Sequence, residues 1–180
     1  MERKHGLHNW FILPVIIYII IYALYSASFL TRFPFVHSDE AWLAGLSRDM
    51  QAVGSFGVTE QFFDLKPRVP HALKLLFHAL QMGYVHVFGY NILSVRLLSL
   101  TSGLICLILL YYIGKELGGR WMGFGLMVLV SLDVPFIYAS HFGRQEIILC
   151  ISLLSCILIL IRCQGCPSTM QALYLASITG

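Results

Sequence analysis

Charged residues are scarce in this chain. Of its 180 residues, 12% are Asp, Glu, Lys or Arg and 58% are hydrophobic, and the mean hydropathy is +0.77. Soluble domains average about 25% charged and about 45–50% apolar residues. The deficit excludes an ordinary soluble domain and indicates an all-α, polytopic integral membrane protein.

Several kinds of binding motif are also missing. The net charge is only +3, and no run of Lys and Arg is present of the kind that binds nucleic acid. Cys163 and Cys166 form a single CxxC, whereas a zinc ribbon needs two pairs. Cys106, Cys150 and Cys156 lie in apolar runs, where cysteine behaves as a small hydrophobe. We therefore expect no nucleic-acid partner, no metal site and no cofactor, although the sequence leaves a divalent cation open.

Long apolar runs predict where the chain crosses a membrane. A spanning helix needs about 20 apolar residues for a hydrocarbon core of about 30 Å. Three runs have about this length, 10–30, 92–113 and 121–138, and a fourth, 147–161, is somewhat shorter. We therefore predict four complete transmembrane helices and a partial fifth over residues 170–180, all in one transmembrane domain of residues 1–180.

Two of these runs leave an alternative open. Residues 10–30 could be a secretory signal peptide, but such peptides have a shorter apolar core of about 7–15 residues. Asp133 lies inside the third run, where a charge is costly and commonly functional. Because Pro135 follows closely, a helix-capping or hydrated position near the membrane surface is equally consistent with the sequence.

The segment of residues 31–91, which is polar as far as about Pro70, is predicted to lie outside the bilayer, on the external side. Ser38 is a suitable N-cap for a short helix over residues 39–50. Asp39 and Glu40 would lie in its first turn, where acids complement the helix dipole, and that alone could account for them.

A second helix is predicted over residues 71–88. Its polar side chains recur at spacings of three and four and so share one stripe: His71, Lys74, His78 and Gln81. A spanning helix would have to bury the lysine at a cost of a few kcal/mol. We therefore expect a juxtamembrane helix that lies in the membrane interface.

The positions of basic residues predict the orientation. Lys and Arg flank the predicted spans in the N-terminal segment and in two short links: Arg3, Lys4, Lys115, Arg120 and Arg162. The positive-inside rule places these segments, and with them the N-terminus, in the cytoplasm. The 31–91 loop and the 139–146 link then share the external face. In a bacterium this would be the plasma (inner) membrane.

Acids and bases from distant positions meet at that external face. Asp39 and Glu40 follow the first predicted span, and Glu146 follows the third. Five cations lie near them and could hold an anion: Lys66, Arg68, Lys74, Arg96 and Arg144. A carboxylate can act as general base toward an incoming hydroxyl or amine. Cations can stabilise the charge on a departing phosphate. The pattern favours group transfer from a lipid phosphate, although Glu146 could equally be an interfacial acid paired with Arg144.

Short motifs in a fixed order strengthen this interpretation. They are HSDEAW at 37–42, KPRVP at 66–70, VFG at 87–89, SVRLLSL at 94–100, LYYIGKELGG at 110–119 and RQE at 144–146. Their order resembles the N-terminal half of the GT-C membrane glycosyltransferases, especially the branch with protein O-mannosyltransferases and lipid A aminoarabinose transferases. Two features differ: the family's Pro-Pro-Leu-Tyr motif is replaced by Pro-Arg-Val-Pro-His, and its members are several hundred residues long. The chain therefore resembles a fragment, which we expect to be inactive alone.

The resemblance implies transfer of a sugar from a polyprenyl-phosphate donor to an acceptor at the external membrane face. It implies Asp39 as the catalytic base, with Glu40 and Glu146 as further acids of the site. The five cations would then bind the donor phosphate. The alternative is a non-enzymatic membrane protein, a transporter fragment or assembly subunit, whose acids and bases line a pathway. Transporters more often place polar residues near the bilayer midplane.

Overall fold

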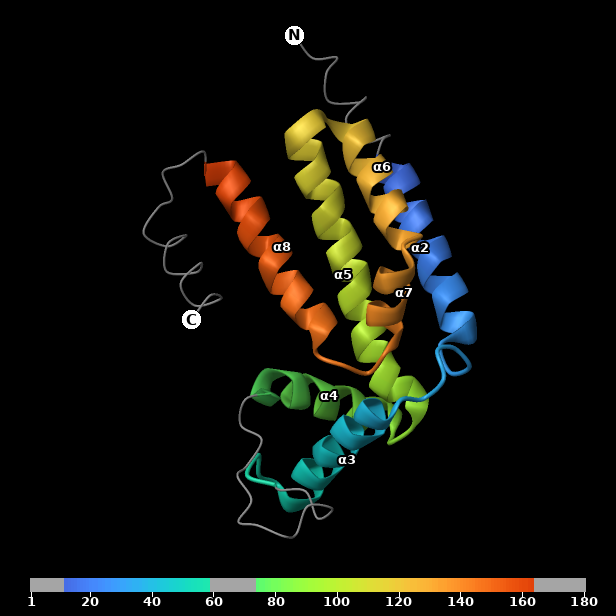
Figure 1. Cartoon of the computed structure of the whole chain (residues 1–180), viewed down its shortest axis with the longest axis vertical. Helices are drawn as coiled ribbons and strands as arrows, with labels where there is room; N and C mark the ends of the chain where they lie inside the picture. The colour runs from blue at the N-terminus through green and yellow to red at the C-terminus, as the bar shows by residue number, and fades with distance from the viewer. Residues whose placement is uncertain (1–11, 59–73, 164–180) are drawn as a thin grey trace.

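The computed structural model describes residues 12–58 and 74–163, and every regular element in these stretches is an α-helix (Figure 1). The helices are α2 (Ile12–Phe29), α3 (Ser38–Val53), α4 (Leu75–Phe88), α5 (Ile92–Gly118), α6 (Arg120–Ser131), α7 (Val134–His141) and α8 (Glu146–Cys163). The predicted all-α class is confirmed for this part of the chain.

Two or three membrane spans can be identified among the described residues. α2 and α5 are each long and apolar enough to cross a bilayer. α6 and α7 qualify only as a pair, which is bent by 72° at the break between them. The four predicted spans are therefore not all confirmed. α8 occupies the fourth predicted run, and its crossing of the membrane stays a prediction; residues 170–180 lie outside the described part.

The third predicted span is wrong as a single helix. Pro135 has no N–H to donate to the α6 ladder, so it favours a new helix start rather than continuation. Asp133 is the N-cap of α7, and its Oδ2 accepts the backbone N–H of Phe136 at 3.2 Å. Of the two interpretations of Asp133, the structure supports the helix cap.

α5 is the central helix of the bundle and packs against α4, α6, α7 and α8. Its approach to α6 is close because glycines face each other: a Cβ on Gly114 would lie 2.8 Å from the Cα of Gly123. Val15 of α2 joins Leu107, Tyr111 and Met127 in a buried apolar cluster. The three candidate spans are thus held together mainly by apolar packing around α5.

The two ends of the molecule contain different helices and turns (Figure 1). α2, α5, α6 and α8 run along the long axis, whereas α3 and α4 lie together at one end, with α4 crossing the bundle. The turn between α5 and α6 and the C-terminal end of α8 lie at the opposite end. This grouping of the short links agrees with the predicted topology, whose membrane sides stay a prediction.

α4 turns its polar stripe toward the protein. His78 and Gln81 are fully buried, and Ser47 of α3 contacts both: its Oγ lies 2.8 Å from His78 Nδ1 and donates to Gln81 Oε1 at 2.5 Å. The outward face is exposed and mostly apolar: it carries Leu75, Leu76, Leu80, Val87 and Phe88, and His86 is exposed as well. An apolar outer face with a covered polar side suits a helix in the membrane interface.

Candidate active site

The N-terminus of α3 positions the first pair of acids. The N-cap is His37 and not the predicted Ser38: His37 Nδ1 accepts the backbone N–H of Asp39 at 3.3 Å. The helix is also longer than predicted and ends at Gly54, whose φ of 69° suits glycine. Asp39 and Glu40 are neighbours in the first turn and so point in different directions, one outward and one into the protein.

Glu40 and Arg96 form a buried ion pair between α3 and α5. The side chain of Glu40 is 2% exposed and that of Arg96 is 0% exposed. Arg96 donates from Nε to Glu40 Oε1 at 2.7 Å and from Nη2 to Oε2 at 2.8 Å. This bidentate geometry is the strong form of an arginine–carboxylate contact.

Two backbone groups complete the buried pair. Arg96 Nη1 donates to the carbonyl oxygen of Leu30, just after α2, at 2.8 Å. Glu40 Oε1 accepts the N–H of Gly143, in the loop between α7 and α8, at 2.9 Å. A Cβ on Gly143 would lie 3.1 Å from Glu40 Oε1 and would also overlap Val95, so this approach requires glycine. This ion pair therefore connects four segments: α3, α5, the end of α2 and the loop between α7 and α8.

Arg144, the next residue, connects the exposed acids. Its Nη2 lies 3.4 Å from Asp39 Oδ2 and 2.9 Å from Glu146 Oε1. The exposed fractions of the Arg144, Asp39 and Glu146 side chains are 38%, 42% and 47%. Two acids 107 positions apart thus share one guanidinium, and their predicted proximity is confirmed by this geometry.

Lys74 lies beside a pocket at the start of α4. Its Nζ is 4.5 Å from the centre of the Trp42 ring, a cation–π distance. The pocket has a volume of ≈ 200 Å³ and lies between α4 and the first turn of α8; its lining is Lys74, Leu76, Phe77, Gln145, Ile148 and Leu149. Apolar walls with a cation at the edge are suited to an amphipathic ligand.

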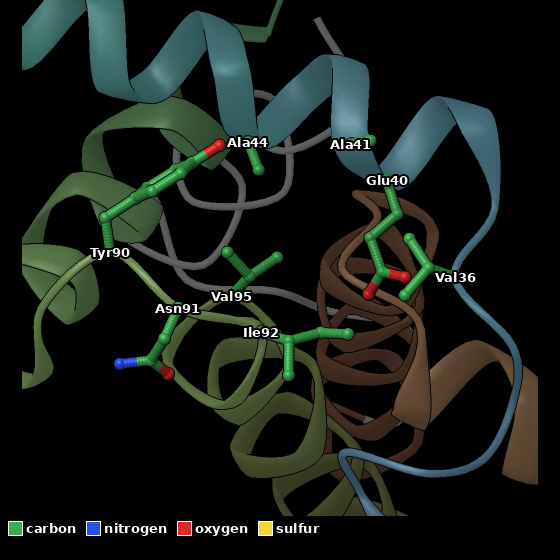
Figure 2. A pocket seen from close by; sticks show the side chains of 8 residues that line it. All are labelled: Val36, Glu40, Ala41, Ala44, Tyr90, Asn91, Ile92 and Val95. Carbon is green, nitrogen blue, oxygen red and sulfur yellow. The ribbon is translucent and has the colours of Figure 1, made fainter.

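A second pocket has Glu40 in its lining (Figure 2). It measures ≈ 170 Å³ and is lined by Val36, Glu40, Ala41, Ala44, Tyr90, Asn91, Ile92 and Val95. Glu40 is the one charged residue of this lining, and its carboxylate is already bound by Arg96. The pocket therefore has no unpaired charge to recognise a phosphate.

The structure thus separates the predicted site residues into three groups. Asp39, Arg144, Glu146 and Lys74 are partly exposed at one end of the bundle, whereas Glu40 and Arg96 are buried. Lys66 and Arg68 lie outside the described residues. No group of three or more His, Cys, Asp or Glu is placed to hold a metal ion within 12–58 and 74–163.

Sequence reasoning missed the groups that hold these side chains. The Leu30 carbonyl has no sequence signature. Serine is a more usual N-cap residue than histidine, so the sequence favours Ser38 over His37. Gly143, beside Arg144, was a detectable clue, because a glycine in a short loop often marks a close backbone approach.

One known protein family matches the larger, C-terminal part of the chain. The model of the dolichyl-phosphate-mannose-protein mannosyltransferase family matches residues 73–180, more than half of the chain. The chain belongs to this family. No curated protein and no solved structure matches it.

Membership confirms the resemblance drawn from the motifs and identifies an integral membrane protein of a glycosyltransferase family. Lys74, Arg96, Arg144 and Glu146 lie within the matched residues of this mannosyltransferase family, whereas Asp39 precedes them. The role of Asp39 therefore rests on its contact with Arg144.

Proposed function

We propose that the protein transfers mannose from a polyprenyl-phosphate mannose, such as dolichyl-phosphate mannose, to a hydroxyl group of a protein. The observation that carries the proposal is the shared contact of Asp39 and Glu146 with Arg144, in a chain of the mannosyltransferase family. Gln145, which lies between Arg144 and Glu146 in the chain, lines the Lys74 pocket, and this supports a donor site beside the contact.

The proposed step is a displacement at the sugar. Asp39 takes the proton of the acceptor hydroxyl as its oxygen forms a bond to the anomeric carbon of mannose. The bond from that carbon to the phosphate oxygen breaks, and its electron pair leaves with the lipid phosphate. The departing group therefore gains negative charge, which Arg144 and Lys74 would stabilise. Glu146 helps to hold Arg144 in position.

The pocket beside Lys74 supports a lipid-linked donor. The first isoprenoid units would lie against Leu76, Ile148 and Leu149, of which Leu76 and Leu149 are more than half exposed. The phosphate would lie at the mouth, between Lys74 and Arg144. The outward apolar face of α4 would keep the remaining chain in the bilayer. On the predicted topology this reaction faces the outside of the membrane.

Glu40 and Arg96 fit a positioning role better than the direct roles predicted from the sequence. A fully buried guanidinium that already serves Glu40 and the Leu30 carbonyl offers no surface to a donor phosphate. The pair instead holds the Gly143 N–H, and hence the backbone from which Arg144 projects. We infer that it fixes Arg144 relative to Asp39.

Transfer measured with the full-length protein in nanodiscs tests the function. Radiolabelled dolichyl-phosphate mannose and a threonine-rich peptide should yield mannosylated peptide, whereas GDP-mannose should yield none. Product formed from GDP-mannose alone would contradict a lipid-phosphate donor. Absence of product and of donor binding would favour the alternative, a non-enzymatic membrane protein.

A further inference from the structure

The two arginines of this site are held in opposite ways. Arg96 is fully buried and uses three nitrogens, Nε, Nη1 and Nη2, on fixed partners. Arg144 is partly exposed, and both of its ion pairs involve the same nitrogen, Nη2. Exposed pairs of this kind are each worth only about 0–1 kcal/mol. Arg96 is therefore a fixed element of the site, and Arg144 is held by contacts that a ligand can replace.

The base and the donor compete for Arg144. While Nη2 stays 3.4 Å from Asp39 Oδ2, a guanidinium occupies the carboxylate that must take the acceptor's proton. A phosphate is a strong partner for arginine because it can accept two parallel N–H bonds. A donor phosphate at the mouth of the Lys74 pocket, beside Gln145, would thus draw the Arg144 side chain toward itself.

The backbone next to Arg144 is anchored by hydrogen bonds, so the side chain could move while the backbone stays in place. The Gly143 N–H donates to Glu40, and Glu40 is paired with Arg96. The Arg144 side chain would therefore move relative to a backbone that is held in position. Glu146 Oε1 forms an ion pair with the same Nη2 at 2.9 Å, and this contact would keep the guanidinium close to the site when no phosphate is bound.

We propose, on the basis of the proposed function, that Arg144 couples donor binding to release of the catalytic base. A bound lipid phosphate takes Arg144 from Asp39, and the freed carboxylate oxygen then accepts the hydrogen bond of the acceptor hydroxyl. Donor and acceptor therefore bind cooperatively, with the donor first. Arg144 acts on the acceptor through Asp39, in addition to its contact with the phosphate.

Cooperativity of this kind is reciprocal and can be measured without turnover. The affinity of a threonine-rich peptide for the full-length protein in nanodiscs is measured with and without saturating dolichyl phosphate, which carries no sugar to transfer. We expect dolichyl phosphate to tighten peptide binding by about fivefold or more, the lower range of allosteric coupling. In Arg144→Gln, peptide binding should be the same with and without dolichyl phosphate.

Arg162→Gln is the matched control. It removes the same charge from a partly exposed arginine that is paired with Glu116, at the other end of α8. This variant should keep the full effect of dolichyl phosphate. Arg144→Lys should keep part of it, because lysine retains the charge without the planar fork.

The outcomes distinguish a failure of the coupling role from a failure of the proposed function. Equal cooperativity in Arg144→Gln and the native protein would overturn the coupling role, as would its absence from a native protein that transfers mannose. A native protein that binds neither dolichyl phosphate nor dolichyl-phosphate mannose would overturn the proposed function itself.

Discussion

Replacing Glu40 with glutamine should destabilise the protein far more than an equal change of charge elsewhere. The substitution keeps the shape of the side chain and removes the negative charge beside Arg96, which is 0% exposed. Glutamine has one oxygen and one NH2 group, whereas the Glu40 oxygens together accept three N–H groups. In either orientation the NH2 group faces at least one donor of Arg96 or Gly143.

The expected loss follows from burial. Removing one partner of a buried ion pair costs about 3–5 kcal/mol, because the other charge stays behind without compensation. The hydrogen bond from Gly143 belongs to the same network, so the cost of losing it is already included in that range of destabilisation. Mannose transfer should fall as well, since the Arg144 backbone is no longer fixed.

Reversible SDS unfolding, followed by circular dichroism in mixed micelles, measures the change in free energy of unfolding. Glu116→Gln is the control, because Glu116 pairs with Arg162 at 3.0 Å in a partly exposed position. That variant should lose no more than about 1 kcal/mol. The double variant Glu40→Leu/Arg96→Met should be more stable than Glu40→Gln, since it leaves no unpaired charge.

Equal losses in Glu40→Gln and Glu116→Gln would refute the claim that the buried pair holds this end of the bundle together. A double variant less stable than the single one would refute the explanation by uncompensated charge.

Three further predictions concern the loops and the topology. Gly143→Ala should cost about 1–3 kcal/mol of unfolding free energy through overpacking and should slow transfer. Gly45→Ala, whose added Cβ would meet nothing within 4 Å, should have neither effect. Asp133→Ala removes the α7 cap and should lower the free energy of unfolding by about 1 kcal/mol in the same assay. Asp133→Asn should keep most of the stability, because asparagine can also act as an N-cap. Cysteines introduced at Ser55 and Lys115 should be labelled from opposite sides of the membrane; labelling from one side would reject the topology.

The sequence predicted which ends of the helices would meet, because a chain that crosses a membrane repeatedly returns its alternate links to one face. That reasoning is sufficient to bring Arg144 and Glu146 near Asp39. It could not assign partners, since several acids and several cations share that face. The pairing of Glu40 with Arg96 depends on the angle between α3 and α5, which local sequence does not encode.

Two other differences have separate physical causes. The break before α7 was encoded in the sequence as Asp133-Val134-Pro135, but hydropathy averages over such a cap and predicts one continuous span. Of the polar stripe predicted from its period, His78 and Gln81 share the buried side of α4, Lys74 is its N-cap, and His71 lies outside the described residues. What covers the buried side is Ser47, 31 residues earlier than His78, and periodicity within one helix carries no information about a neighbour.

The catalytic role of Asp39 is tested most directly by the turnover of Asp39→Asn in the full-length protein. Asparagine keeps the size of the side chain and removes the oxygen that would take the acceptor's proton. Loss of a general base typically costs about 10²–10⁴ in rate. We therefore expect kcat for mannose transfer to fall by that factor while dolichyl-phosphate mannose still binds. Turnover close to that of the native protein would contradict Asp39 as the base.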